Sequence, residues 1–345
     1  MRTLSLAFAA AALVGTADAA PTLTIEAINR ADPTIEMGEL PAKGARRRAA
    51  VFDRAFDRRE DGAECSAALV RLQTMLDRAH ASPVVVDGYA GQNTASAIRS
   101  FERMHSLPVD GRLDPAVWKL LMVASPGPVA RQHTLSEDDV NVRLVDLPAN
   151  RTGRALKDYE CLCYETHAEA LAERFHMDVD LLRAMNPGAD FSRAGTTIAV
   201  VDPGKPKTGK VARVTVDKSE EMVFGYDEND RLTFAARASI GSASTPSPSG
   251  TMGINVVVQD PNYRWSPETL DTSGDEVFFL APGPNNPVGA TWIDLKKDGY
   301  GIHGTPEPAT IGRAESHGCV RLTNWDAENL SKRVVPGETV VEFTD

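Results

Sequence analysis

Two histidines and a cysteine lie close together near the end of the chain. The sequence IHGT occupies positions 302–305, and SHGCVR occupies positions 316–321. A thiol attacks a carbonyl carbon as the thiolate, and a nearby imidazole is the usual group that takes up its proton. This combination predicts Cys319 as a nucleophile, with His303 and His317 as the imidazoles that serve it.

The residues next to the thiol add two further elements of chemistry. Gly318 permits a tight turn, so that the backbone N–H groups of Gly318 and Cys319 can point at a developing oxyanion. Arg321 supplies a fixed cation for a substrate carboxylate or for a structural ion pair. Two other interpretations stay open at this point. The histidines can be structural and the cysteine simply buried, or His303, His317 and Cys319 can form a zinc site that lacks an obvious fourth ligand.

The start of the chain predicts export. Arg2 precedes positions 4–14, which are apolar apart from Ser5, and positions 17–19 form a small-residue cleavage site. This is the layout of a signal peptide over residues 1–19, with Ala20 as the first mature residue. The apolar run is too short to span a bilayer and no later run is longer, so no transmembrane segment is expected. The formal net charge of -11 argues against nucleic acid as a partner.

Export to an oxidising compartment favours disulfides, and the chain has four cysteines. Cys319 is expected to be free. Cys161 and Cys163 are separated by one residue, too close for easy pairing with each other in a strand. A disulfide between Cys65 and one of that pair is therefore expected, and the alternative leaves all three unpaired.

Two small modules are predicted before residue 203. Residues 20–64 have no sustained periodicity and are interpreted as a leader, flexible or locally helical. Residues 65–124 contain a near-repeat, VDG at 86–88 and at 109–111, and each Asp-Gly turn precedes a helix start. With the helix face of Leu69, Leu72 and Leu76, this predicts a three-helix module.

The second module covers residues 134–202, after a linker that begins at 125–128. Thr166 and Glu169 form a capping box at a helix start, and a second helix starts near Asp178. A strand at 197–201 closes a helix-helix-strand unit.

The last part of the chain, residues 211–345, changes to a period of two. Strands are predicted at 211–216, 221–226, 232–240, 254–258, 277–280, 290–295 and 339–343. One helix is predicted late, capped by Thr323 with Asp326 three residues on. The fold class expected for the whole chain is multidomain α+β, in which the last domain is mostly antiparallel β.

Each of the three regions resembles a known family. The 303–321 segment is similar to the signature of YkuD-like L,D-transpeptidases, and further matches lie at 245–251, 282–289 and 311–313, so that the resemblance spans 211–344. Residues 65–124 resemble the peptidoglycan-binding domain type 1 at Asp87-Gly88, Gly91, Thr94 and Phe101. Residues 134–202 resemble a degenerate LysM-type glycan-binding domain at Glu169, Leu171, Ala172, Phe175 and Asn186-Pro187.

The resemblance to L,D-transpeptidases implies roles for individual residues. Cys319 attacks the carbonyl before the terminal D-alanine of a peptidoglycan stem and forms a thioester. His303 is the general base, His317 orients the site, and the backbone at Gly318 and Cys319 forms the oxyanion hole. Arg321, Ser316 and Gly304 are expected to contact the substrate.

The same resemblance implies the setting of the reaction. The acyl acceptor is a diaminopimelate amine, the partners are stem peptides and glycan strands, and no metal or organic cofactor is required. The protein is expected in the periplasm, attached to the wall through its two front modules, and is expected to be a carbapenem target. A carboxypeptidase, a lipoprotein-anchoring enzyme of the same family and a non-catalytic wall-binding protein stay open as alternatives. So does the oligomeric state.

Overall fold

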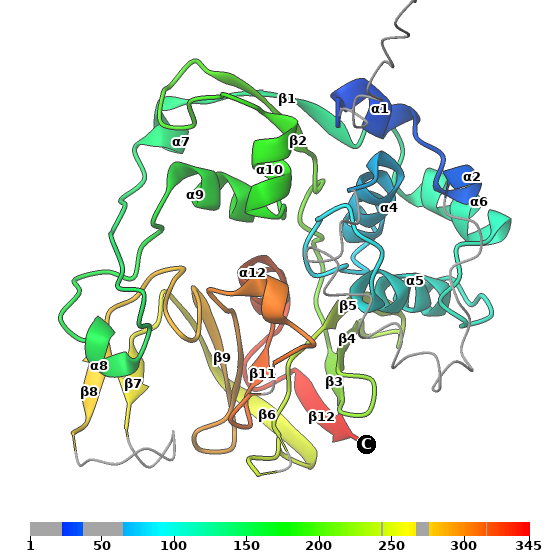
Figure 1. Ribbon diagram of the computed structural model, residues 1–345. Coiled ribbons are helices and arrows are strands. Elements are labelled where there is room, and N and C mark those ends of the chain that lie inside the picture. Colours follow the sequence, from blue (N-terminus) through cyan, green and yellow to red (C-terminus); the bar gives the residue numbers. More distant parts are fainter. Residues whose placement is uncertain (1–22, 37–64, 243, 267–275, 315) are drawn as a thin grey trace, which may run out of the picture.

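Three modules follow one another along the chain and meet around one central helix (Figure 1). The computed structural model describes residues 23–36, 65–242, 244–266, 276–314 and 316–345. The predicted signal peptide and most of the predicted leader lie outside these ranges. Within them, helices and strands both occur in quantity, and the α+β class is confirmed.

The first module is helical, as predicted. Its helices are α4 (Ala67–Arg78), α5 (Gln92–Met104) and α6 (Pro115–Ala124). Asp114 caps α6 by accepting from the N–H groups of its first turn, and Pro115 takes the first helical position. Gly88 and Gly111 have φ of +77° and +74°, values that glycine adopts at no steric cost. The two predicted Asp-Gly turns are therefore confirmed.

A short part of the predicted leader belongs to this core. Helices α1 (Ile25–Arg30) and α2 (Pro33–Glu36) pack against α4. The Asn29 side chain donates to the carbonyl of Ala130 at 2.8 Å and accepts from the N–H groups of Val129 and Ala130. Ile28 is fully buried. The segment 23–31 is thus an integral part of the fold.

The second module is a two-stranded sheet with two helices. Strand β1 (Ala130–Thr134) pairs antiparallel with β2 (Thr197–Val201). Helices α9 (His167–Arg174) and α10 (Val179–Met185) begin at the predicted caps, Thr166 and Asp178, and the capping box of Thr166 and Glu169 is confirmed. The opening strand lies almost entirely before the predicted boundary at residue 134.

Residues 135–166, which we call the strap, connect β1 to α9 and leave their own module. The strap contains α7 (Glu137–Val140) and α8 (Gly153–Leu156). Leu156 and Leu162 form a buried cluster with Leu280 of the third module, and Tyr263 packs against this cluster. Figure 1 accordingly shows α8 beside strands β7 (Tyr263–Trp265) and β8 (Phe278–Leu280).

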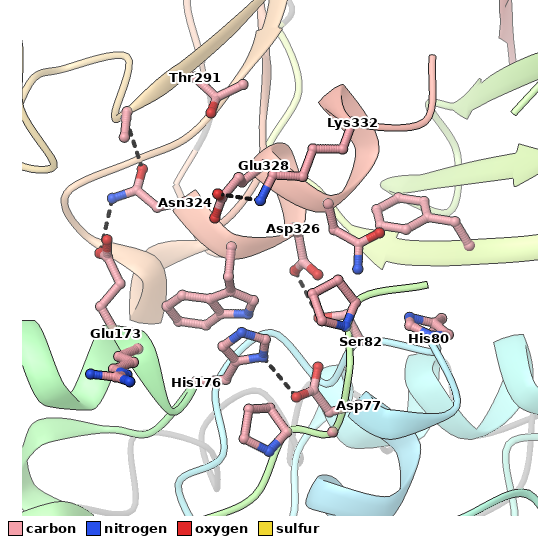
Figure 2. Close-up of a pocket in the computed structure, with 18 of the residues that line it drawn as sticks. Asp77, His80, Ser82, Glu173, His176, Thr291, Asn324, Asp326, Glu328 and Lys332 are labelled. Atoms are coloured by element: carbon pink, nitrogen blue, oxygen red, sulfur yellow. Dashed lines mark hydrogen bonds and ion pairs between the residues drawn. The ribbon is translucent and has the colours of Figure 1, made fainter. Parts of the chain in front are cut away.

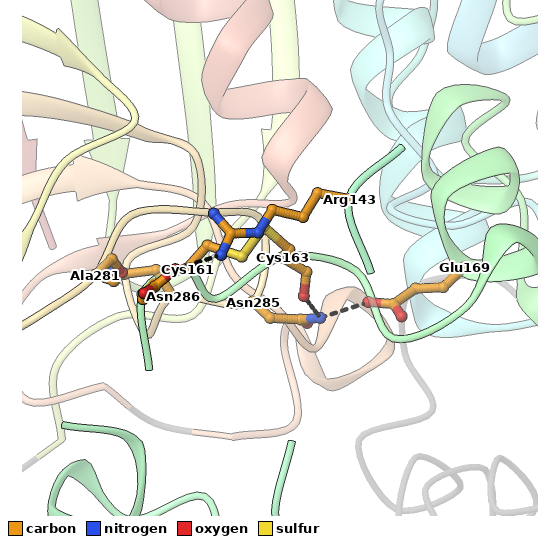
Figure 3. Close-up of a disulfide and its surroundings, with 8 residues drawn as sticks. Arg143, Cys161, Cys163, Glu169, Ala281, Asn285 and Asn286 are labelled. Atoms are coloured by element: carbon orange, nitrogen blue, oxygen red, sulfur yellow. Dashed lines mark hydrogen bonds and ion pairs between the residues drawn. A yellow bond between two sulfur atoms is a disulfide. The ribbon is translucent and has the colours of Figure 1, made fainter. Parts of the chain in front are cut away.

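A disulfide between Cys161 and Cys163 lies in the strap, so the expected pairing with Cys65 was wrong (Figure 3). The segment is not a strand here. It turns so that the two Cα atoms are 5.3 Å apart, within the range that a disulfide bridges. Cys65 is free, and its thiol donates to the carbonyl of Asp87 at 3.3 Å.

The third module is built on an eight-stranded sheet in the order β11-β10-β9-β6-β12-β3-β4-β5. The strands are β3 (Arg213–Asp217), β4 (Met222–Tyr226), β5 (Leu232–Arg237), β6 (Gly250–Gln259), β9 (Thr291–Leu295), β10 (Gly301–His303), β11 (Val320–Arg321) and β12 (Val340–Thr344). Two pairs, β3 with β12 and β10 with β11, are parallel, and the others are antiparallel. A single 3-10 turn, η1 (Pro308–Thr310), lies between β10 and β11.

Helix α12 (Asn324–Ser331) is the central helix, and its predicted cap Thr323 accepts from the N–H of Asp326. Ala327 and Leu330 join the buried core of the large sheet. Trp325 instead packs with Val84 and Val85 of the first module and with Ile311. In the described part of the chain, no helix combines the length and the apolar character that crossing a membrane requires.

Candidate active site

The predicted base lies on β10, and the predicted nucleophile directly precedes the neighbouring strand β11, at one edge of the large sheet. In the parallel pair β10–β11, Ile302 is opposite Val320 and His303 is opposite Arg321. Since residues opposite each other in a sheet project to the same face, His303 and Arg321 share one face, and Cys319 directly precedes β11. The Cys319 thiol donates to the carbonyl of Gly299 at 3.5 Å, and a Cβ at Gly301 would overlap the Trp292 ring that stacks on His303.

The turn that carries Cys319 is held by hydroxyl groups. Gly318 has φ of +108°, and a Cβ at this position would come within 2.8 Å of the Tyr300 ring, so glycine is required. Ser316 is buried, and its hydroxyl donates to the carbonyl of Cys319 at 2.5 Å and accepts from the N–H of Gly318 at 3.2 Å. Ser316 therefore shapes the turn from inside.

The segment at 239–247 braces the same turn from outside. Ser247 is buried, and its hydroxyl donates to the carbonyl of Gly318 at 2.9 Å. Thr245 donates to the carbonyl of Ser316 at 3.2 Å, and Ser239 exchanges backbone hydrogen bonds with Arg321. The motif at 245–251, noticed in the sequence as a family resemblance, thus has a direct physical role beside the nucleophile.

His303 is buried and held in one orientation. Its Nδ1 lies 2.7 Å from the carbonyl oxygen of Gly304, and its ring stacks on Trp292 with centroids 5.4 Å apart. A carbonyl can only accept, so Nδ1 carries the proton and Nε2 has the free lone pair. Burial lowers the pKa of His303 to about 4; the hydrogen bond to Gly304 opposes this shift and the charge of Arg321 adds to it. The imidazole is therefore neutral near pH 7.

Cys319 is a partly exposed free thiol. Burial raises the pKa of Cys319, and a hydrogen bond from the Gly301 N–H and the charge of Arg321 only partly oppose this effect. The resting site therefore contains a neutral thiol and a neutral imidazole. Such a pair requires proton transfer to the imidazole before or during attack by sulfur.

Arg321 and Tyr263 lie close enough to the Cys319 thiol to interact with it electrostatically. Burial lowers the pKa of Arg321, and the nearby charges of Glu307, Cys319 and Tyr263 oppose this. Burial and then the charge of Cys319 raise the pKa of Tyr263. Tyr263 belongs to β7, which the strap covers, so the second module reaches the surroundings of the nucleophile. The sequence contained no signal for Tyr263, because β7 was not predicted.

The predicted residues differ in how they are placed. His303, Cys319, Arg321 and the turn at Gly318 come together at one edge of the sheet. The side chain of His317 is exposed, in contrast to that of His303. Gly304 is buried against Asn324 of α12, where a Cβ would overlap the Asn324 side chain. Asn324 was also missed by the sequence, although the cap at Thr323 located its helix.

A cavity of about 480 Å³ lies where the three modules meet (Figure 2). Asp77 bonds to His176 at 2.8 Å, and the His176 ring stacks on Trp325 with centroids 5.0 Å apart. Ser82 donates to Asp326 at 2.7 Å. Burial first, and then the charge of Asp77, raises the pKa of Asp326 to about 7. This cavity is lined by polar groups that join the modules together.

Comparison with known proteins identifies the family of the module that contains His303 and Cys319. The model of the L,D-transpeptidase catalytic domain matches residues 212–342, and that of the "Putative peptidoglycan binding domain" matches residues 66–121. The "Putative L,D-transpeptidase YkuD" of Bacillus licheniformis is 30% identical over 177 residues, which are 51% of this chain and 92% of the relative. The chain belongs to the L,D-transpeptidase family and is an enzyme of the transpeptidase class.

Other relatives match over a smaller share of their length. The "Probable L,D-transpeptidase YcfS" of Escherichia coli is 27% identical over 186 residues, which cover 50% of this chain and 57% of that protein. Among solved structures, L,D-transpeptidase 3 from Mycobacterium tuberculosis with a faropenem-derived adduct is 17% identical. It has a TM-score of 0.33 over 43% of this chain and 67% of that one. The LysM-like interpretation of residues 134–202 stays a prediction.

Proposed function

We propose that the protein is a cysteine L,D-transpeptidase of peptidoglycan, with Cys319 as nucleophile and His303 as general base. The observation that carries the proposal is the buried His303 of β10, bonded through Nδ1 to Gly304, on the strand that pairs with β11, which the free thiol of Cys319 directly precedes. A neutral imidazole with a free Nε2 can accept the thiol proton, and a fixed Nδ1–H bond stabilises the imidazolium that results.

The reaction proceeds in two steps, formation of a thioester and transfer of its acyl group to an amine. Sulfur of Cys319 attacks the carbonyl carbon before the terminal D-alanine of a stem peptide, and the thiol proton moves to Nε2 of His303. The C–N bond then breaks, the leaving amine takes that proton, and a thioester remains. An acceptor amine next attacks the thioester, loses a proton through His303, and releases the thiol.

The remaining site residues stabilise the charge that develops in the reaction and orient the substrate. The N–H of Cys319 stabilises the oxyanion, since backbone donors aimed at the developing charge lower the barrier of acyl transfer. The N–H of Gly318, predicted as the second donor, instead donates to the Ser316 hydroxyl. Arg321 binds a carboxylate of the stem. Gly304 and Ser316, predicted to contact the substrate, are buried and support the site from inside. His317 orients the site and helps to polarise the thiol.

The setting of the enzyme follows from its modules. A match to a peptidoglycan-binding family next to the catalytic domain indicates association with the cell wall. Tethering raises the effective concentration of an active site near an insoluble polymer. We infer that the protein is exported to the periplasm, that its acceptor is a diaminopimelate amine, and that carbapenems acylate Cys319.

Two experiments test the proposal. Purified protein mixed with imipenem should gain the mass of one adduct on the peptide that contains Cys319, and Cys319→Ala should gain none. Incubation with tetrapeptide muropeptides should then give crosslinked dimers. Tripeptides without dimers would indicate a carboxypeptidase, and transfer only to a lysine-bearing lipoprotein peptide would indicate an anchoring enzyme. Sacculus binding without any adduct or product would leave only a wall-binding protein.

A further inference from the structure

Asn324, the first residue of α12, connects the second module to the strand that carries His303. Its side-chain nitrogen donates to the Glu173 carboxylate at 2.9 Å (Figure 2). The same nitrogen donates to the carbonyl of Pro284 at 3.1 Å. Its side-chain oxygen accepts from the N–H of Ala290 at 3.4 Å. Asn324 is 4% exposed, so these bonds are protected from water.

Glu173 reaches Asn324 from α9, outside the catalytic module. The hydroxyl of Tyr164, in the strap, donates to the other carboxylate oxygen of Glu173 at 2.9 Å. Burial raises the pKa of Glu173 to about 7, and the bonds from Asn324 and Tyr164 partly oppose that shift. Glu169 and His176 are the other titratable neighbours that act on this group. Burying the Glu173 carboxylate costs desolvation free energy. The two side chains that donate hydrogen bonds to it, Tyr164 and Asn324, are uncharged.

The contact continues from Asn324 to the proposed base. Gly304 follows His303 directly and lies so close to Asn324 that no side chain would fit between them. The N–H of Leu322, two residues before Asn324, donates to the carbonyl of His303 at 2.8 Å. The Gly304 carbonyl in turn binds Nδ1 of His303 at 2.7 Å. Gly304 is also held by its N–H bond to the Thr291 carbonyl at 3.2 Å, and its packing against Asn324 limits where the acceptor for the His303 N–H can lie.

We propose that Glu173 is a positioning residue for His303, acting through Asn324 and the Gly304 peptide. The non-catalytic second module thereby holds the imidazole in the tautomer that leaves Nε2 free. This inference rests on the proposed function, in which His303 is the general base. It assigns to the second module a task in catalysis besides any binding of glycan.

The test compares four variants of the full-length mature chain: Glu173→Ala, Glu173→Gln, Asn324→Ala and the double variant Glu173→Ala with Asn324→Ala. The control is Glu328→Ala, which removes a carboxylate from the same cavity that pairs with Lys332 instead. The first readout is the rate of Cys319 acylation by imipenem. The second is the ¹⁵N shift pattern of the His303 ring, which reports the tautomer.

Glu173→Ala should slow acylation by up to about 100-fold, the cost of displacing a catalytic group by about 1 Å, and should give a mixture of His303 tautomers. Glu173→Gln keeps an oxygen acceptor for Asn324 and should recover most of the rate. The double variant should be no slower than Asn324→Ala, because both residues act through one chain of contacts. Glu328→Ala should match the wild type in both readouts.

An unchanged tautomer and an unchanged rate in Glu173→Ala would overturn the inference. If that variant loses its cooperative unfolding transition, Asn324→Ala provides the same decision, since a wild-type tautomer ratio in Asn324→Ala also refutes the inference. A wild-type protein that forms no adduct on Cys319 contradicts the proposed function. In that case the tautomer comparison still decides whether Glu173 positions His303.

Discussion

The buried carboxylate of Asp326 should make the stability of this protein decrease as the pH rises. Asp326 is 5% exposed, accepts hydrogen bonds from Ser82 and Thr323, and faces Asp77 across the cavity (Figure 2). Burial, followed by the charge of Asp77, raises its pKa from 3.8 to about 7. The perturbation is Asp326→Asn, which keeps the shape and an oxygen acceptor but cannot ionise.

The magnitude follows from proton linkage. At about pH 3 both the folded and the unfolded chain hold this proton, and the group contributes nothing to the pH dependence. Between about pH 4 and pH 7 the unfolded chain loses the proton while the folded chain keeps it, so the free energy of unfolding falls with rising pH. The two pKa values correspond to a total of roughly 4 kcal/mol. Asp326→Asn lacks this contribution, and its stability relative to the wild type should increase by that order between about pH 4 and pH 8.

Urea unfolding at several pH values measures the effect, with tryptophan fluorescence as the probe because Trp325 stacks on His176 beside the cavity. Asp298→Asn is the matched control, since Asp298 is exposed and its replacement should change stability by less than about 0.5 kcal/mol at every pH. A stability difference between Asp326→Asn and wild type that is the same at pH 4 and pH 8 would refute the reasoning.

Three further predictions concern the turn and the strap. Gly318→Ala should lower the free energy of unfolding by at least about 1 kcal/mol and abolish imipenem adducts, because an alanine at φ of +108° is strained and meets Tyr300; a wild-type adduct yield in mass spectrometry would contradict this. Ser247→Ala removes a buried hydrogen bond to the Gly318 carbonyl and should cost about 1 kcal/mol in thermal unfolding; an unchanged melting temperature would argue against that bond. The double variant Cys161→Ala with Cys163→Ala opens a very short loop, so it should cost no more than about 2 kcal/mol globally. Hydrogen exchange in β8 and residues 281–285 should nevertheless become faster, and unchanged exchange there would show that the disulfide does not hold the strap in place.

The sequence predicted helix starts and strands correctly wherever the residues that cause the structure lie within the same short segment. The cap residues Thr166, Asp178 and Thr323 start helices at the expected positions, because a cap acts on the backbone of the next turn. Most of the longer strands were found because period-two burial extends over five or more residues. Strands β10 and β11 were missed, since two or three residues are too few to show a period.

The Cys161–Cys163 disulfide of the strap could not be predicted from sequence patterns. Whether Cys161 pairs with Cys163 depends on the turn between them, and that turn is formed against residues 282–285. The N–H of Leu162 donates to the carbonyl of Pro282, and the carbonyl of Leu162 accepts from the N–H of Asn285, each at 2.9 Å. No local rule predicts bonds between segments so far apart along the chain.

The sequence by itself determined which groups are candidates for the reaction, because the types and spacing of His303, Gly318 and Cys319 already predict a thiol, an imidazole and a tight turn. Only the tertiary structure decided which state those groups adopt. Burial lowers the pKa of His303, and the hydrogen bond to the Gly304 carbonyl selects its tautomer. Gly304 packs against Asn324, and Asn324 donates to the carboxylate of Glu173. Residues 151 positions apart are joined there by one hydrogen bond. Burial and contact depend on the whole folded chain, whereas residue type does not.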